Sequence, residues 1–319
     1  MSQTIVTVTL NPAIDQTVIL DALRPGAVNP ARAVTFNAGG KGVNVAGCLA
    51  DWKASRIVAT GLLGRGNADV FETMFRDKDI VDAFIRQEGL NRVNIKLVDS
   101  SNHDTTDINL PAGPTDSEAF PKLLERLQQL AGSGHYFVLS GSLPTGLPDD
   151  TYIQLLQTLR ERGAWVLLDT SGEALGRVLR GPAASLPMCI KPNRSELEQL
   201  TGRALPTLSD VAAEAAKLLA QGIEKVVVSL GGDGALFVDA DGAWHAQPLP
   251  LSIISTVGAG DAMVAGLIAG ISAGQSWPDC ARLAVAFASG KLAQIGPHLP
   301  EHKELERLAH SVQLARLEN

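Results

Sequence analysis

The sequence STVGAGD at Ser255–Asp261 leads into a run of small apolar residues, AMVAGLIAGI, at residues 262–271. This order predicts that an extended segment turns into the N-terminus of a buried helix at the glycines. Backbone N–H groups at a helix N-terminus lack intrahelical partners. Gly258 and Gly260 carry no Cβ, so an anion could approach these amides closely. The stretch therefore predicts a buried helix with an anion site at its start.

Asp261 adds a carboxylate at the mouth of this anion site. A carboxylate that accepts a proton, beside amides that hold developing negative charge, is what phosphoryl transfer to a hydroxyl requires. Asp261 is therefore the candidate catalytic base, and Gly258, Ala259 and Gly260 form the candidate anion hole. The alternative is a glycine turn followed by an aspartate that favours the helix dipole.

The chain around this stretch alternates β-rich and helical segments. Helical segments between consecutive strands predict a mainly parallel sheet with right-handed crossovers and helices on both faces, an α/β/α sandwich of the Rossmann type. A hairpin-like pair at 235–238 and 243–247 precedes the glycine stretch, and everything after Asp261 is expected to be helical to residue 315. The expected strands are Thr4–Leu10, Ile57–Gly61, His135–Ser140, Trp165–Asp169, Met188–Lys191 and Lys225–Leu230.

Two segments, 11–38 and 80–112, interrupt this alternation with short strand-like stretches that have no helices between them. We expect them to form a small separate β-sheet that covers the main unit as a lid. The main unit would then consist of residues 1–10, 39–79 and 113–319. No low-complexity linker or repeat of fixed period divides the chain further.

The composition of the 319 residues, 45% hydrophobic and 19% charged, is that of a globular protein with a sizeable core, and the net charge of −7 argues against a nucleic-acid or anionic-membrane surface. Cys48, Cys189 and Cys280 lie in apolar stretches without a CxxC motif, which favours buried thiols in a reducing cytoplasm. The N-terminus has no basic region typical of a signal peptide, and the histidines have no metal-ligand spacing.

Polar residues and glycines follow each expected strand end, where ligands bind in open parallel sheets. Each group could merely cap a helix or form a turn, but all fall on one edge of the sheet, so we expect one site there. The chain lacks both GxxxxGK[ST] and a complete GxGxxG, which excludes the usual mononucleotide and dinucleotide motifs. The groups are Asn11 and Asp15, Ser140–Ser142, Asp169–Gly172, Lys191–Asn193, Ser229–Gly234 and Gly258–Asp261.

Asn193 and Glu196 stand three residues apart at the start of an expected helix. Their oxygens would suit Mg²⁺, bound through its waters, but a capping box explains the pair equally well. The loop Ser229–Gly234 could wrap a polyphosphate with backbone amides, although Asp233 is an unfavourable charge there unless it points to solvent.

On the other side, Lys41 and Arg92 are candidates for binding the phosphate of an acceptor, because glycines and the expected lid strands adjoin them. The alternative for a lone lysine or arginine is a solvated surface cation. Asp15 and Asn44 could bind sugar hydroxyls, and each could instead serve only as a turn or cap residue.

Six sequence motifs, taken in their order along the chain, resemble those of the PfkB branch of the ribokinase-like carbohydrate kinases, and the resemblance covers nearly the whole chain. Within the branch, RVNIKL from Arg92 followed by TDIN from Thr106 is most similar to the 1-phosphofructokinase subfamily, with tagatose-6-phosphate kinases next. The motifs that carry the resemblance are NPAID from Asn11, GGKGVN from Gly39, SGSLP from Ser140, KPNRSE from Lys191, SLGGDG from Ser229 and STVGAGD from Ser255.

The resemblance implies a ribokinase-like fold, ATP, Mg²⁺ and a β-lid that closes over the sugar and often mediates homodimers. It implies that Asp261 is the base, that Gly258–Gly260 form the anion hole and that Asn193 and Glu196 lie around the Mg²⁺. In some members, carbonyls near Ser255 and Val257 hold a monovalent cation such as K⁺. Along the nucleotide would lie Lys191, Asn193, Ser229, Gly231 and Gly234, and along the sugar phosphate Asp15, Gly39, Gly40, Lys41, Asn44, Arg92 and Ser142.

The expected reaction is transfer of phosphate from ATP to fructose 1-phosphate, giving fructose 1,6-bisphosphate and ADP. Tagatose 6-phosphate and fructose 6-phosphate are alternative acceptors, since the residues separate these sugars poorly. A non-catalytic sugar-phosphate sensor with the same fold is a further alternative, although a sensor has no need of Asp261 together with the Asn193 and Glu196 pair.

Overall fold

The computed structural model of the chain describes residues 3–102, 104–254, 257–294 and 296–317. In these ranges, eleven strands form one large sheet in the order β15-β14-β13-β12-β11-β10-β9-β1-β4-β5, with β6 paired to β4 off this path. The strands are β1 (Thr4–Thr9), β4 (Arg56–Gly64), β5 (Val81–Asp82), β6 (Ile85–Gln87), β9 (Tyr136–Ser140), β10 (Trp165–Asp169), β11 (Cys189–Ile190), β12 (Lys225–Ser229), β13 (Ala235–Asp239), β14 (Gly242–Ala246) and β15 (Leu314–Arg316).

The large sheet is parallel from β12 to β5 and antiparallel from β12 to β15. Strand β1 pairs with β4 on one side and β9 on the other, with Thr9 opposite both Gly61 and Ser140. The chain builds the sheet outward in opposite directions from β1 and β9. This is the switch point of an open parallel sheet, where a crevice forms beyond the carboxyl ends of the strands.

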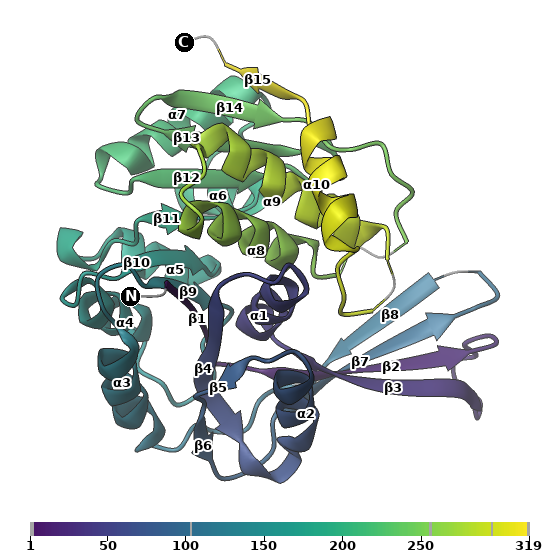
Figure 1. Cartoon of the computed structure of the whole chain (residues 1–319). Helices are drawn as coiled ribbons and strands as arrows, with labels where there is room; N and C mark the ends of the chain where they lie inside the picture. The colour runs from purple at the N-terminus through teal and green to yellow at the C-terminus, as the bar shows by residue number, and fades with distance from the viewer. Residues whose placement is uncertain (1–2, 103, 255–256, 295, 318–319) are drawn as a thin grey trace.

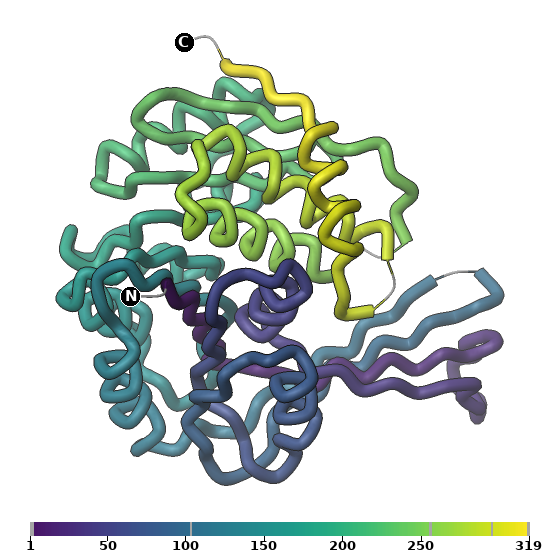
Figure 2. The backbone as a smooth tube through the Cα atoms, viewed as in Figure 1, coloured from purple at the N-terminus to yellow at the C-terminus, as the bar shows by residue number. Residues whose placement is uncertain are grey.

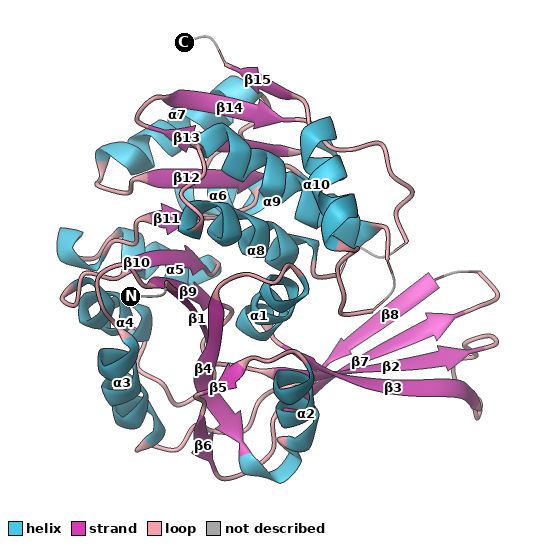
Figure 3. Ribbon diagram, in the orientation of Figure 1, coloured by secondary structure: helices cyan, strands magenta, loops and turns pink. Residues whose placement is uncertain are grey.

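Helices cover both faces of this sheet (Figures 1 and 3). One face carries α1 (Lys41–Asp51), α2 (Asp69–Asp77), α8 (Ala259–Ser272), α9 (Trp277–Leu292) and α10 (His302–Ser311). The other face carries α3 (Ala119–Leu130), α4 (Thr151–Arg160), α5 (Gly172–Leu179), α6 (Arg194–Thr201) and α7 (Leu208–Ala220). Short 3₁₀ turns lie at η1 (Arg65–Asn67), η2 (Ala183–Ser185) and η3 (Gly231–Asp233).

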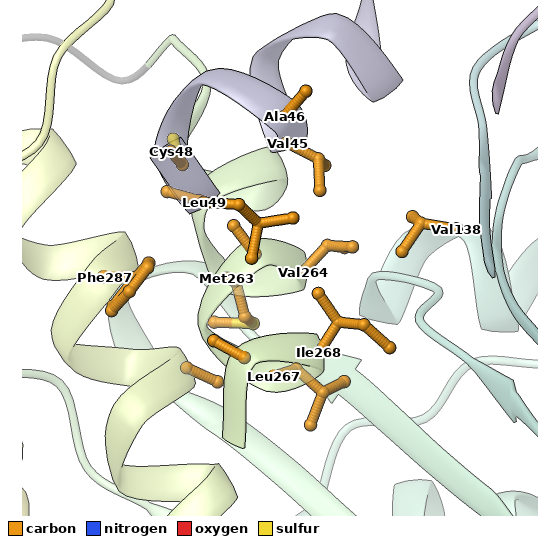
Figure 4. Packing of buried hydrophobic residues seen from close by; sticks show 14 of the residues in the cluster. Val45, Ala46, Cys48, Leu49, Val138, Met263, Val264, Leu267, Ile268 and Phe287 are labelled. Carbon is orange, nitrogen blue, oxygen red and sulfur yellow. The ribbon is translucent and has the colours of Figure 1, made fainter. Parts of the chain in front are cut away.

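Each face of the sheet has its own hydrophobic core, because successive residues of a strand point to opposite sides. Ile5 of β1 packs into the core beneath α8, whereas Val6 packs into the core beneath α3 and α4. In the first core, the apolar faces of α1, α8 and α9 meet above β9 (Figure 4). The expected α/β/α sandwich with a mainly parallel sheet is confirmed.

A second, four-stranded sheet in the order β3-β2-β7-β8 projects from one side of the body (Figure 2). Its strands are β2 (Ala13–Leu20), β3 (Ala31–Gly39), β7 (Arg92–Asp99) and β8 (Asp104–Asn109). We call this sheet the lid sheet. It leaves the body at the carboxyl end of β1 and returns through the start of α1, so it borders the crevice at the switch point.

The two faces of the lid sheet differ in polarity. Residues opposite each other on neighbouring strands share a face. The register aligns Phe36, Gln16, Ile95 and Ile108 in one row and Val34, Val18 and Leu97 in the next row of the same face. The opposite face presents the row of Asn37, Asp15, Asn94 and Asn109. The lid sheet therefore has one apolar and one polar face.

Two expectations about strands were wrong. Val81–Gln87 was assigned to the lid, but β5 and β6 pair with β4 and extend the edge of the large sheet. The last helix was expected to run from Glu301 to Ala315; α10 ends at Ser311, and β15 pairs with β14. Strand β3 also reaches Gly39, one residue past the expected end of the first lid segment.

None of the helices in the described ranges is both long enough and apolar enough to cross a membrane.

Candidate active site

The glycine stretch forms the start of helix α8, as its sequence predicts. Gly258 is the N-cap residue with φ of 78°, a left-handed conformation that favours glycine, and the helix proper begins at Ala259. Ala259, Gly260 and Asp261 are the first three helical residues, and the first bond of the helix joins Ala262 N to Gly258 O. The N–H groups of the first turn point toward the space beyond the helix, where the dipole favours an anion.

Asp261 is almost buried, with 7% of its surface exposed. Asn44 of α1 donates from Nδ2 to Asp261 Oδ2 at 2.8 Å, which fixes the carboxylate. Burial raises the pKa of Asp261 to about 6, and repulsion from Asp169 adds to this rise. The Asn44 hydrogen bond and the charges of Lys41 and Lys191 act in the opposite direction. Asp261 is therefore poised to exchange a proton near neutral pH.

Asp169, at the carboxyl end of β10, brings two lysines to the same place. Asp169 is 1% exposed; Lys41 Nζ lies 3.3 Å from its Oδ2, and Lys191 Nζ lies 3.3 Å from its Oδ1. Burial alone would lower the pKa of Lys41, but the carboxylates of Asp169 and Asp261 outweigh it and raise that pKa. Lys41 is therefore held charged beside the start of α8, and Lys191 lies on the other oxygen of the same carboxylate.

Lys191 also approaches the start of α8 directly. A Cβ placed on Gly260 would lie 3.8 Å from Lys191 Nζ, so the ammonium group adjoins the backbone of the anion hole. Two ammonium groups and the amides of one helix N-terminus thus converge next to the Asp261 carboxylate. This combination suits a phosphoryl group that carries negative charge and a hydroxyl that must lose a proton.

On the acceptor side, hydrogen bonds join the lid sheet to the switch point. Arg92 donates from Nε to Asn11 Oδ1 (3.1 Å) and from Nη1 to Asn94 Oδ1 (2.7 Å). Asn94 donates in turn to Asp15 Oδ1 (2.9 Å), and Asn11 donates to Ser142 Oγ (3.1 Å). These polar groups hold one another in place along the crevice, where hydroxyls and a phosphate would find donors and acceptors.

Asp15 lies against the backbone of β3. A Cβ on Gly39 would lie only 2.4 Å from Asp15 Oδ2, so this glycine makes room for the carboxylate. Burial raises the pKa of Asp15, although Asn94, Lys96 and Arg92 oppose the rise. Gly40 follows as the N-cap residue of α1, which begins at Lys41. Asp15, Gly39 and Gly40 thus lie together where the lid sheet meets α1.

A cavity of about 410 Å³ opens at this side of the site. Asn11 and Arg92 line it together with Leu62, Leu90 and Pro144. Of the predicted sugar-side residues, only Arg92 lines it, so the cavity adjoins the site at Arg92 and does not contain Asp261.

On the nucleotide side, Ser229 ends β12 and forms a bridge with Asn193. Gly231 begins the η3 turn and Gly234 follows it, so the expected polyphosphate loop lies beside the start of α6. The side chain of Asp233 is 68% exposed and pairs with Arg194 at 3.5 Å. Its charge therefore points to solvent.

Asn193 and Glu196 form a capping box at the start of α6. Asn193 Oδ1 accepts from Glu196 N, and Glu196 Oε2 accepts from Asn193 N, both at 2.8 Å. Within the described residues, no group of three or more His, Cys, Asp or Glu side chains gathers around a point. The carboxylate of Glu196 also contributes to the raised pKa of Lys41. This donor set fits an ion that keeps most of its waters and binds mainly to phosphate.

The sequence did not single out Asn94 and Lys96, and it indicated Asn11 and Asp169 only as residues at strand ends. Asp169 was recognised only as a strand end, and Asn94 and Lys96 alternate with Arg92 on β7, so strand periodicity was the available signal. Ser255, named for a monovalent cation, lies outside the described residues.

The profile of the pfkB family carbohydrate kinases matches residues 8–304. A 1-phosphofructokinase of Xanthomonas campestris is 48% identical over 92% of both chains, and one of Rhodobacter capsulatus is 44% identical over 99% of both. The crystal structure of phosphofructokinase-2 from Escherichia coli in complex with potassium has a TM-score of 0.90 at 29% identity, covering 97% of this chain and 99% of that one.

Proposed function

The chain belongs to the pfkB family of carbohydrate kinases, and on this premise we propose that it phosphorylates the C6 hydroxyl of fructose 1-phosphate. It is an ATP-dependent sugar-phosphate kinase, a phosphotransferase that acts on a sugar hydroxyl, and its family implies a divalent metal. The choice of fructose 1-phosphate is supported by relatives with 48% and 44% identity that are named 1-phosphofructokinase.

The observation that carries the proposed chemistry is the position of Asp261, held by Asn44 at the start of α8 beside two lysines. In our proposal, Asp261 accepts the proton of the C6 hydroxyl while that oxygen attacks the γ-phosphorus of ATP, and ADP leaves. The amides of Gly258, Ala259 and Gly260 hold the transferring group. The lid sheet excludes water that would otherwise hydrolyse ATP.

The other residues divide between the two substrates. We propose that Asp15, Gly39, Gly40, Asn44, Arg92 and Ser142 bind the sugar phosphate together with Lys41. Lys191, Asn193, Ser229, Gly231 and Gly234 would lie along the nucleotide. Asn193 and Glu196 would hold Mg²⁺ through its waters, and the ion would neutralise phosphate charge. The capping box at α6 already engages Asn193 Oδ1 and Glu196 Oε2, so only their remaining lone pairs would bind the waters of the ion.

The substrate proposal is tested by coupled ADP release with fructose 1-phosphate, tagatose 6-phosphate, fructose 6-phosphate and fructose. We expect kcat/KM for fructose 1-phosphate to exceed the others by about 10-fold or more, the discrimination that a few oriented polar contacts supply. Fructose 6-phosphate is the main alternative substrate, because the similar phosphofructokinase-2 was also solved with that sugar. A higher kcat/KM for fructose 6-phosphate than for fructose 1-phosphate would contradict the proposal. If none of the acceptors caused ADP release, the non-catalytic sugar-phosphate sensor would be the remaining function.

A pH profile follows from the pKa of Asp261. Since the base must be unprotonated and its pKa is raised to about 6, log kcat/KM should fall with a slope near one as the pH drops below about 6. Above that pH the carboxylate is charged and the profile should level off. Initial rates from pH 5 to 8 check this, and a flat profile over the range would contradict the assignment.

We further propose that the kinase is a homodimer formed through the apolar face of the lid sheet. Phe36 is 56% exposed and Val34 and Ile108 are each 43% exposed on this face, an unusual display for strands of a single chain. In a two-fold dimer, the apolar face of one lid sheet would pack against the same face of the other lid sheet, so both chains would bury these residues. A similar structure, at 28% identity, is described as a tetrameric form, so assembly occurs among such folds.

Phe36→Glu should therefore convert the dimer into a monomer, because a charge would be buried in the interface. Sedimentation velocity should give the mass of two chains for the unaltered protein and of one chain for the variant. Val28→Glu is the matched control: Val28 is 96% exposed in a loop of the lid, off the strands, and its replacement should leave the dimer intact. An unaltered protein with the mass of one chain would refute the interface.

The three cysteines support a reducing compartment, which we propose is the cytoplasm. Cys48, Cys189 and Cys280 are free and buried. Burial raises the pKa of the Cys48 and Cys280 thiols to about 12, so they remain unreactive thiols that contribute to packing.

A further inference from the structure

Lys291, in the last turn of α9, is a buried lysine that the proposed mechanism does not use. It is 7% exposed. Its Nζ donates to the carbonyl oxygen of Gly296 at 2.5 Å and to that of His298 at 3.5 Å. A Cβ placed on Gly258 would lie 3.3 Å from Lys291 Cε. The side chain therefore runs past the N-cap of α8 and ends in main-chain carbonyls next to the anion hole.

No carboxylate neutralises this lysine in the part of the chain that the structure describes, since none of the ion pairs there includes it. The nearby acids are engaged elsewhere: Asp51 pairs with Lys78 at 2.6 Å, and Asp261 accepts from Asn44. Burial, together with the ammonium of Lys78, lowers the pKa of Lys291, although Cys48, Asp51 and Asp261 oppose the change. A buried cation held only by carbonyls is costly unless an anion arrives to balance it.

Main-chain carbonyls that surround a single positive charge are the ligand set of a monovalent metal ion such as K⁺. A similar structure was solved with potassium, and a cation held by carbonyls near Val257 was expected here from the sequence. In this chain, the carbonyls of Gly296 and His298 are already taken by a covalently attached ammonium group. This arrangement does not fit an exchangeable ion at those carbonyls.

We propose that Lys291 serves as a built-in monovalent cation beside the anion hole, so that phosphoryl transfer by this enzyme needs no K⁺. The inference rests on the proposed kinase function. Lys291 is a positioning residue: its charge supports the phosphate through the backbone around Gly258, adding to the helix dipole and to Lys41 and Lys191. Because the ammonium is tethered, the site is occupied at any ionic composition.

Two variants separate charge from packing. Lys291→Ala removes the ammonium and opens the carbonyls, and Lys291→Met fills the space without charge. Rates are measured at saturating ATP, Mg²⁺ and fructose 1-phosphate in KCl and in tetramethylammonium chloride of equal ionic strength. Binding of Tl⁺, a probe for K⁺, is followed by ²⁰⁵Tl NMR, and folding by thermal unfolding. Lys225→Ala is the control, since Lys225 pairs with Asp239 away from the site.

We expect the unaltered enzyme and Lys225→Ala to have the same kcat in both salts within about 2-fold, and to bind no Tl⁺ at the carbonyls. Lys291→Ala should lose about 10-fold or more of kcat in tetramethylammonium chloride, as for loss of one electrostatic contact to the transition state. KCl should restore most of that loss, and Tl⁺ should bind. Lys291→Met should be equally slow, without rescue by KCl.

The proposal fails if the unaltered enzyme needs K⁺, or if Lys291→Ala keeps its kcat in tetramethylammonium chloride. It also fails if Lys291→Ala folds normally but is neither rescued by KCl nor binds Tl⁺, which would make the lysine a structural tether. If neither variant folds, the unaltered enzyme decides, since K⁺ activation or Tl⁺ binding there overturns the proposal. Absence of ADP release in either salt would instead remove the kinase function, and Tl⁺ binding would still test the position of Lys291.

Discussion

Asp261→Asn should lower kcat by about 10²–10⁴-fold, the usual contribution of a general base. The amide keeps the size of the side chain and can still accept the hydrogen bond from Asn44, but it cannot take the proton of the sugar hydroxyl. Because the backbone amides at the start of α8 are unchanged, the Kd for ATP should change little. Steady-state kinetics and isothermal titration with ATP measure the two quantities.

The matched control is Asp279→Asn. Asp279 is the third residue of α9, as Asp261 is of α8, but its N–H donates to the N-cap residue Ser276 and its carboxylate pairs with Arg282 at the surface. Its replacement should leave kcat unchanged. Near-normal turnover of Asp261→Asn would remove the base assignment, whatever the control shows.

Arg92→Ala should reduce kcat/KM for the sugar phosphate by about 10²-fold, mostly through KM. Charged hydrogen bonds that lose one partner cost about 2–5 kcal/mol, and 2.7 kcal/mol corresponds to that factor. The substitution also frees Asn11 and Asn94, which Arg92 now holds, so the acceptor crevice would lose its order. The Kd for ATP should remain unchanged in isothermal titration.

Arg32→Ala provides the comparison for Arg92→Ala within the same sheet. Arg32 lies on β3, is largely exposed and pairs only with Asp21 among the described residues, so its loss should leave both KM values unchanged. If Arg92→Ala instead lost ATP binding and kept its KM for the sugar phosphate, Arg92 would belong to the nucleotide side.

Much of the fold could be predicted from local sequence, because a long segment with a single hydrophobic periodicity indicates its own secondary structure. The strands around β1 and the buried helix α8 fall where apolar runs and glycines place them. Strands β5 and β6 could not be assigned, since two or three residues of alternating polarity fit either sheet and only pairing with β4 decides. Strand β15 similarly depends on β14, which is distant in the sequence.

The location of the candidate site could be predicted from the sequence, but the contacts between its side chains could not. The rule that ligands bind at strand ends predicted Asp169, Lys191 and Asp261 at one edge, and Lys41 was a candidate because glycines and lid strands adjoin it. That Asp169 pairs with both lysines, and that Asn44 holds Asp261, depends on contacts between segments far apart in the chain. The sequence did not indicate a role for Lys291, because the helix dipole alone favours lysine in the last turn of a helix.

The position of the γ-phosphate is the most direct test of the central claim, that the start of α8 beside Asp261 is where phosphoryl transfer occurs. A crystal structure with Mg²⁺, fructose 1-phosphate and an ATP analogue that does not react would show it. We predict that a γ-phosphate oxygen accepts hydrogen bonds from backbone amides of Gly258–Gly260, with the C6 hydroxyl next to the Asp261 carboxylate. A γ-phosphate that contacts neither these amides nor the sugar hydroxyl would contradict the account.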